Sequence, residues 1–226
     1  MTLSCLDSFA AESAKLRELL ALLLLTGADV IEMPSALYVK LELTPNPRYL
    51  LRIENPEETP NYPGINRFIC RKNGFNSSVS TISELQINDV RELNFLSRYS
   101  GLKNVRIVGL DDVLCHDYES IFKNIEKQFP DKVEFCPEDS LNCAAAAAVE
   151  WVMLGGSEIV ASFGGVGNKA PLEEVLVALK IAKRYRPNAS YAIFPQIAQL
   201  LEEIMAEKYP GNKAVIGDSI FNVESG

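Results

Sequence analysis

The stretch that decides the fold runs from Val133 to Lys180 and reads VEFCPEDSLNCAAAAAVEWVMLGGSEIVASFGGVGNKAPLEEVLVALK. It begins with a short apolar strand, and a helix of small residues follows over Leu141–Leu154. A second strand, EIVASF, leads into a helix over Pro171–Tyr185 with the proline in its first turn. Apolar strands that alternate with amphipathic helices predict parallel strands joined by helical crossovers. Both a (β/α) barrel and an open doubly wound sheet satisfy this pattern.

The rest of the chain continues the alternation, although its middle is harder to assign. We predict helices over Phe9–Leu25, Ser83–Tyr99, Tyr118–Phe129 and Tyr191–Glu207, and strands over Asp29–Pro34, Tyr49–Ile53, Arg67–Arg71 and Asn104–Leu110. The proline-rich acidic segment before Arg67 is expected to be a loop. The region between Pro34 and Asn104 offers room for two strand–helix units with one clear helix.

The composition excludes several classes of protein. The chain has 226 residues, of which 47% are hydrophobic, and a formal net charge of -8 at pH 7. This acidic balance argues against a nucleic-acid partner. The apolar run over Leu19–Gly27 is too short to span a bilayer, and no cleavage site follows it, so we expect no membrane span and no signal peptide. Five scattered cysteines without CxxC spacing indicate reduced thiols and a cytoplasmic location.

Three segments resemble motifs of one enzyme family, in the family's order. Thr26–Pro34 (TGADVIEMP) is similar to G-x-D-x-I-E-x-G-x-P. Val133–Lys180 is similar to H-x-H-N-D-x-G followed by N-G-x-G-E-R-x-G-N-x-x-L-E-E-V, and Asn212–Gly226 to K-A-I-V-G-x-x-x-F-x-H-E-S-G. These are motifs of the HMG-CoA lyase-like family, which includes the isopropylmalate and homocitrate synthases. Phe135 and Cys143 place the chain nearest to the homocitrate synthases.

The resemblance implies a TIM-type (β/α) barrel with ligands at the C-terminal ends of its strands. Because the middle region looks short, we expect an incomplete barrel of about six or seven strands with an open edge. Residues 1–208 are expected to form this shortened barrel, and residues 209–226 the start of the family's post-barrel segment.

The resemblance also implies a reaction. Family members bind a divalent metal that chelates a 2-oxo acid and polarises its ketone, while a general base forms the enolate of acetyl-CoA. The activity implied is therefore that of an acyltransferase.

The positions of the family's metal ligands carry other residues in this chain. The H-x-H pair is replaced by Cys136 and Glu138, which still share one face of a strand. Asp7 or Cys5 marks the remnant of the R-D-G-E-Q strand, and the post-barrel histidine is Val223. The G-N step after G-E-R is missing. We therefore expect no metal cofactor in this chain and no catalysis by the chain alone.

Other residues remain candidates for chemistry. Glu32 matches the family glutamate of the second strand, although it could equally cap a neighbouring basic group. His116, the only histidine, and Glu224 of the ESG ending are further catalytic candidates, although a lone histidine is more often a surface residue. The candidates for binding a substrate or another anion are Glu32, Gly165, Gly167 and Lys169, the last standing at the family arginine position.

Besides an active enzyme with altered chemistry that uses Cys136, Glu138 and His116, two functions remain open from the sequence. The first is a homocitrate synthase-like or isopropylmalate synthase-like subunit that acts in a homo- or hetero-oligomer with a full-length, metal-competent relative. The second is a non-catalytic regulatory module, derived from the barrel, that binds an acyl-CoA or another anion. The expected ligands in both cases are CoA esters or 2-oxo acids, with no nucleic-acid or membrane partner.

Overall fold

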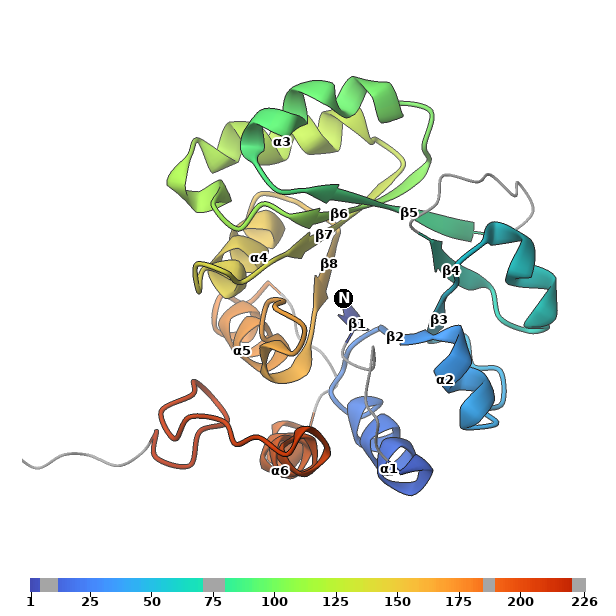
Figure 1. Ribbon diagram of the computed structural model, residues 1–226. Coiled ribbons are helices and arrows are strands. Elements are labelled where there is room, and N and C mark those ends of the chain that lie inside the picture. The colour runs from blue at the N-terminus through green and yellow to red at the C-terminus, as the bar shows by residue number, and fades with distance from the viewer. Residues whose placement is uncertain (5–11, 71–79, 185–189, 221–226) are drawn as a thin grey trace, which may run out of the picture.

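The computed structural model describes residues 1–4, 12–70, 80–184 and 190–220. Eight parallel strands follow one another in chain order and close into a barrel (Figure 1). The strands are β1 Thr2–Ser4, β2 Val30–Pro34, β3 Tyr49–Arg52, β4 Arg67–Cys70, β5 Ser80–Ile87, β6 Asn104–Gly109, β7 Lys132–Pro137 and β8 Glu158–Ala161. The barrel closes where β1 pairs with β8, with Thr2 opposite Val160 and Leu3 opposite Ala161. The TIM-type barrel inferred from the resemblance is confirmed.

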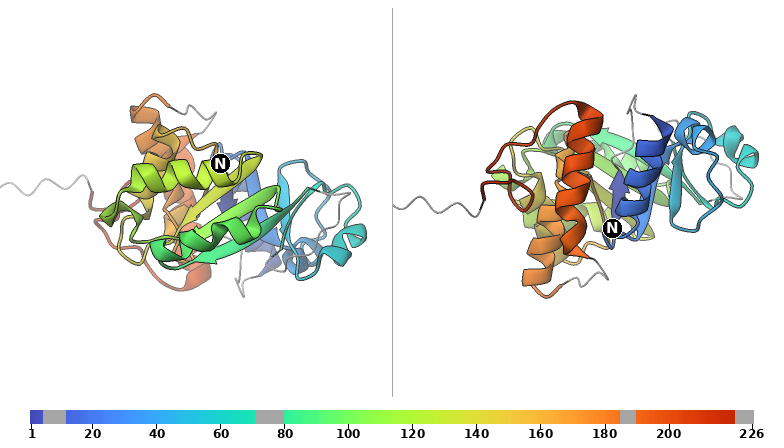
Figure 2. Two further views of the ribbon diagram at one scale, coloured as in Figure 1. Left: turned by 90° about the horizontal axis from the view of Figure 1, so that it is seen from above. Right: turned by 90° about the horizontal axis from the view of Figure 1, so that it is seen from below.

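Helices surround the barrel. The α-helices are α1 Ser13–Leu23, α2 Ser35–Lys40, α3 Tyr118–Gln128, α4 Ala144–Met153, α5 Leu172–Ile181 and α6 Phe194–Met205. The 3-10 helices are η1 Pro56–Asn61, η2 Val90–Tyr99, η3 Val113–Cys115, η4 Phe163–Gly165 and η5 Tyr191–Ile193. Helix α6 packs beside α1, so the end of the barrel region returns to its beginning (Figure 2). No helix among the described residues is long and apolar enough to cross a membrane.

The expectation of six or seven strands is wrong, because the middle region contains three strands and not two. The segment predicted as a helix over Ser83–Tyr99 contains the second half of β5, and the 3-10 helix η2 follows it. The proline-rich segment expected to be a loop forms η1, in which the Asn55 side chain and Glu58 make a capping box. Short 3-10 helices replace full crossover helices here, so three strands fit into the short stretch.

Apolar side chains fill both faces of the sheet. The large core lies between the strands and the helices, and Trp151 of α4, with an exposed fraction of 0%, packs edge-on against Phe122 of α3. Two small clusters come from the alternate faces of the strands: Val30, Leu50, Ile69 and Ile82 form one, and Val108, Cys136 and Val160 form the other. Since alternate residues of a strand point to opposite faces, these clusters fill the inside of the barrel.

Candidate functional site: the mouth of the barrel

A cavity of about 750 Å³ lies at the C-terminal ends of the strands. Its lining comes from β2, β3, β5, β6 and β7 and from the segments that follow β2, β3, β7 and β8: Pro34, Ser35, Ala36, Arg52, Ile53, Glu54, Glu84, Gln86, Arg106, Val108, Cys136, Glu138, Gly167 and Lys169. We call this cavity the mouth. It is the place where TIM barrels hold their ligands, and its volume suits a small-molecule site.

An ionic layer forms the floor of the mouth. Arg52 donates from Nε and Nη2 to Oε1 of Glu32, at 2.9 and 2.6 Å, and from Nη1 and Nη2 to Glu84, at 3.0 and 2.7 Å. Arg106 donates from Nη1 to Oε2 of Glu32 at 2.5 Å. Its Nε and Nη2 donate to Oε2 of Glu134, at 2.9 and 2.7 Å. Two arginines and three glutamates from five different strands are therefore joined into one network.

Burial makes this layer energetically demanding. Glu32, Arg106 and Glu134 are all buried, and Arg52 keeps 20% of its side chain exposed toward the mouth. Burial alone would raise the pKa of Glu32, but the positive charges of Arg106 and Arg52 outweigh it and lower the pKa to about 2. Burial likewise opposes the charge of Arg106, but Glu32 and Glu134 raise its pKa above the ordinary value. Glu32 and Arg106 are therefore both charged at neutral pH.

The sequence motifs point to Glu32 but not to its partners. Arg106 and Glu134 each stand as a single charge inside an otherwise apolar strand, NVRIVG and VEFC. Charged side chains are rarely buried unless they are paired, so isolated charges in neighbouring strands of a parallel barrel are the signal that could have located the layer. Glu84 gave no such signal, because its strand had been assigned to a helix.

Cys136 and Glu138 both line the mouth, so the positions of the family's H-x-H pair keep a common face. Cys136 is buried, and this burial raises the pKa of its thiol to about 12, so the thiol stays protonated at neutral pH. The backbones of Glu138 and Lys169 pair in an isolated antiparallel β-bridge. This pairing joins the segments that follow β7 and β8. The backbone N–H of Asp139 strengthens this junction by donating to the carbonyl of Asn168 at 3.1 Å.

Of the anion-binding candidates, Gly167 and Lys169 line the mouth, Glu32 lies in its ionic floor, and Gly165 is not part of the lining. Lys169 crosses toward the first strand, where its Nζ donates to Oγ of Ser4 at 3.0 Å. The positive charge of Lys169 also contributes to lowering the pKa of Glu32. The mouth is thus bordered by an ammonium group above a floor of two arginines and three glutamates.

The described residues do not fit a divalent metal. At the positions of the family's imidazole pair, the chain offers one buried thiol, Cys136, and one carboxylate, Glu138. The carboxylate of Glu32 is already taken by two arginines, and a dication beside it would also meet the charges of Arg52, Arg106 and Lys169. No group of three or more His, Cys, Asp or Glu side chains in the described part of the chain is arranged to hold a metal ion.

The remaining candidates lie away from the mouth or outside the described residues. His116 is exposed beyond the end of β6, and its Nε2 lies 3.0 Å from Oδ2 of Asp112, four residues earlier on the surface. It is not part of the lining of the mouth. Cys5, Asp7, Val223 and Glu224 lie in segments that the structure does not describe.

Comparisons with known proteins place this geometry in context. No protein-family model matches the chain. The chain is 27% identical over 222 residues to the homocitrate synthase omega subunit of Clostridium pasteurianum, covering 89% of this chain and 63% of that protein. It is 31% identical over 121 residues to the 2-isopropylmalate synthase of Brevibacillus brevis, covering 49% of this chain and 24% of that protein. The resemblance to the isopropylmalate and homocitrate synthases is confirmed.

The fold comparison agrees. The HMG-CoA lyase of Bacillus subtilis superposes with a TM-score of 0.69 at 16% identity, covering 92% of this chain and 95% of that one. At this identity the match shows the fold alone. The homocitrate synthase-like chain spans less than two thirds of the length of the curated relatives above.

Proposed function

We propose that the chain is a homocitrate synthase-like subunit that does not perform the condensation alone and acts beside a metal-competent, full-length relative. In the family, the metal polarises the ketone of a 2-oxo acid, and that step has no equivalent among the described residues here. The residues of this chain supply a stable barrel with a mouth of about 750 Å³.

The ionic layer is the observation that carries this proposal. It occupies the end of the barrel where the family holds its metal. Both carboxylate oxygens of Glu32 accept hydrogen bonds from arginines, Oε1 from Arg52 and Oε2 from Arg106. The similarity to a protein named an omega subunit supports the partner, because that name belongs to a protein with more than one kind of subunit.

Co-expression with a full-length homocitrate synthase tests the proposal. The chain alone should give no condensation of acetyl-CoA with 2-oxoglutarate above background. The pair should co-purify, and removing the chain from the pair should lower its turnover or its stability. Turnover by the isolated chain would refute the proposal, and so would failure to associate with any full-length relative of the same organism.

Two control variants test whether residues of this chain take part in the condensation or only stabilise the complex with the partner. Cys136→Ser and Glu138→Gln change the two residues at the family's metal-ligand positions and preserve their size. Both variants should leave the turnover of the pair unchanged, because neither residue handles the reacting atoms. A loss of more than about tenfold in turnover with intact association would place chemistry in this chain.

The alternative is a regulatory module that binds an acyl-CoA or another anion without turnover. The position of Lys169 and Gly167 at the mouth favours it, since an ammonium beside a glycine-containing loop can receive a phosphate or carboxylate. Calorimetry of the chain with acetyl-CoA and with 2-oxoglutarate separates the two functions. Binding that Lys169→Met abolishes, with no effect of the chain on a partner's turnover, would favour the module.

A further inference from the structure

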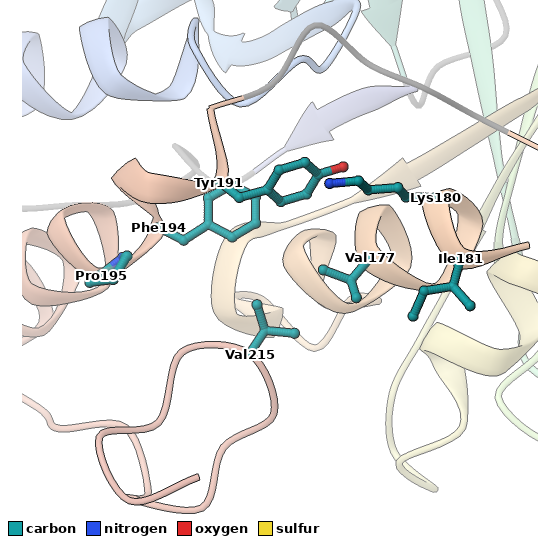
Figure 3. Close-up of a pocket in the computed structure, with 7 residues that line it drawn as sticks. All are labelled: Val177, Lys180, Ile181, Tyr191, Phe194, Pro195 and Val215. Carbon is teal, nitrogen blue, oxygen red and sulfur yellow. The ribbon is translucent and has the colours of Figure 1, made fainter. Parts of the chain in front are cut away.

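A second cavity, of about 540 Å³, lies outside the barrel between α5, the start of α6 and the turn that follows α6 (Figure 3). Its lining is Val177, Lys180, Ile181, Tyr191, Phe194, Pro195 and Val215. None of these residues lines the mouth, so the outer cavity is separate from the candidate site.

The polar groups of the outer cavity gather at one end. The Nζ of Lys180 lies 4.1 Å from the centroid of the Tyr191 ring, a cation–π contact. Figure 3 shows the Lys180 ammonium and the Tyr191 hydroxyl pointing toward one another. No acidic side chain of the described residues pairs with this ammonium. The buried hydroxyl of Tyr191 has no hydrogen-bond partner within the described part of the chain.

The other walls are apolar. Val177 and Ile181 lie one helical turn apart on α5, Phe194 and Pro195 begin α6, and Val215 closes the side beyond α6. Ile181, with 75% of its surface exposed, stands at the rim. The exposed ammonium of Lys180 at one end of an apolar cavity complements a ligand with one anionic end and an apolar body.

We propose that the outer cavity binds a small organic acid with a single carboxylate and a branched or aromatic apolar body. The carboxylate would receive the exposed ammonium of Lys180, which has no acidic partner among the described residues. The apolar body would lie against Val177, Phe194 and Val215. A dicarboxylate would place its second charge against these apolar walls, so the outer cavity selects against dicarboxylates such as 2-oxoglutarate.

Methyl NMR of the full chain tests this assignment, because three methyl-bearing residues line the cavity: Val177, Ile181 and Val215. The probes are 3-phenylpropanoate and its uncharged amide, which differ in the carboxylate. We expect the acid to shift these methyl signals in a saturable manner and to bind about tenfold more tightly than the amide, as a charge-assisted hydrogen bond implies.

Two variants test whether Lys180 causes the preference for the acid over the amide. Lys180→Met should bring the affinity for the acid down to that of the amide, whereas Lys123→Met, which changes an exposed lysine on α3, should leave the tenfold ratio unchanged. The ratio in the parent chain decides the question even if a variant fails to fold. Equal binding of acid and amide, or no saturable shift, would overturn the assignment. Shifts of the same methyl groups with protein concentration alone would also overturn it, since they would indicate contact with a second copy.

Discussion

Arg106 is the residue on which the ionic layer depends, since it is the link between Glu32 and Glu134. Replacing it by methionine would leave two carboxylates buried with less compensation, and breaking a buried ion pair costs about 3–5 kcal/mol. We expect Arg106→Met to lower the free energy of unfolding by that amount. Urea denaturation followed by the fluorescence of buried Trp151 measures the change.

Lys123→Met is the matched control, because the ion pair of Lys123 with Glu119 is exposed. This variant should change the free energy of unfolding by less than about 0.5 kcal/mol. Equal effects of the two substitutions would mean that the ionic layer contributes no more than a surface pair.

Glu173 predicts a pH dependence of stability. Burial raises the pKa of its carboxyl from 4.5 to about 7, although the N–H of Gly164 donates to its Oε2 at 2.9 Å and Lys213 lies near. Because the folded pKa is raised, the contribution of this group is complete below pH 4.5 and is lost as the pH rises through 7. We expect Glu173→Gln to be more stable than the parent above neutral pH, by up to about 3 kcal/mol.

Unfolding of Glu173→Gln and of the parent should be compared from acid to alkaline pH, so that other titrating groups cancel. The difference should shrink steadily as the pH falls toward 4.5. A difference that stays constant over this range would show that the carboxyl of Glu173 has an ordinary pKa. Glu174, which is half-exposed and paired with Lys213, is the neighbouring position to test in the same way.

At the scale of elements, the loop after β8 is held by the segment beyond α6. Gly164 has φ of +66°, and a Cβ built there would lie 2.0 Å from the Tyr209 hydroxyl. Gly164→Ala should therefore destabilise the chain by about 1–3 kcal/mol, from backbone strain and overlap. Thermal unfolding measures the loss.

Gly101→Ala provides the control, because a Cβ at Gly101 meets nothing within 4 Å. It should change the free energy of unfolding by less than about 1 kcal/mol. If Gly164→Ala behaved like Gly101→Ala, the contact between Tyr209 and the loop would not exist in solution.

The β5 strand shows why the middle of the barrel could not be predicted from sequence. In STISELQI the side chains of Leu85 and Ile87 join the outer core, and Ile82 joins an inner cluster. Glu84 also points inward, where Arg52 neutralises it. An inward-facing charge disguises the apolar alternation of a strand, and its partner lies on a strand distant in sequence. In NVRIVG and VEFC the inward-facing Arg106 and Glu134 have apolar neighbours on both sides, and these strands were predicted correctly.

For the whole molecule, the barrel closes because short strands and short helices fit three strands between β2 and β6. The family resemblance gave the TIM-type architecture, but the strand count depends on β3, β4 and β5 fitting where only two units had been expected. The closed barrel has no open edge, so the described strands need no partner strand to cover one. A partner is therefore proposed from the lost metal chemistry and the subunit-like relative, and no longer from an exposed strand.

Equilibrium dialysis of the purified chain against Mn²⁺ and Zn²⁺ tests the central claim most directly, with bound metal counted per chain. Because both carboxylate oxygens of Glu32 accept from arginines, we predict that less than stoichiometric metal is retained, and that Glu138→Gln changes nothing. One tightly held ion per chain, released by Glu138→Gln, would contradict the account.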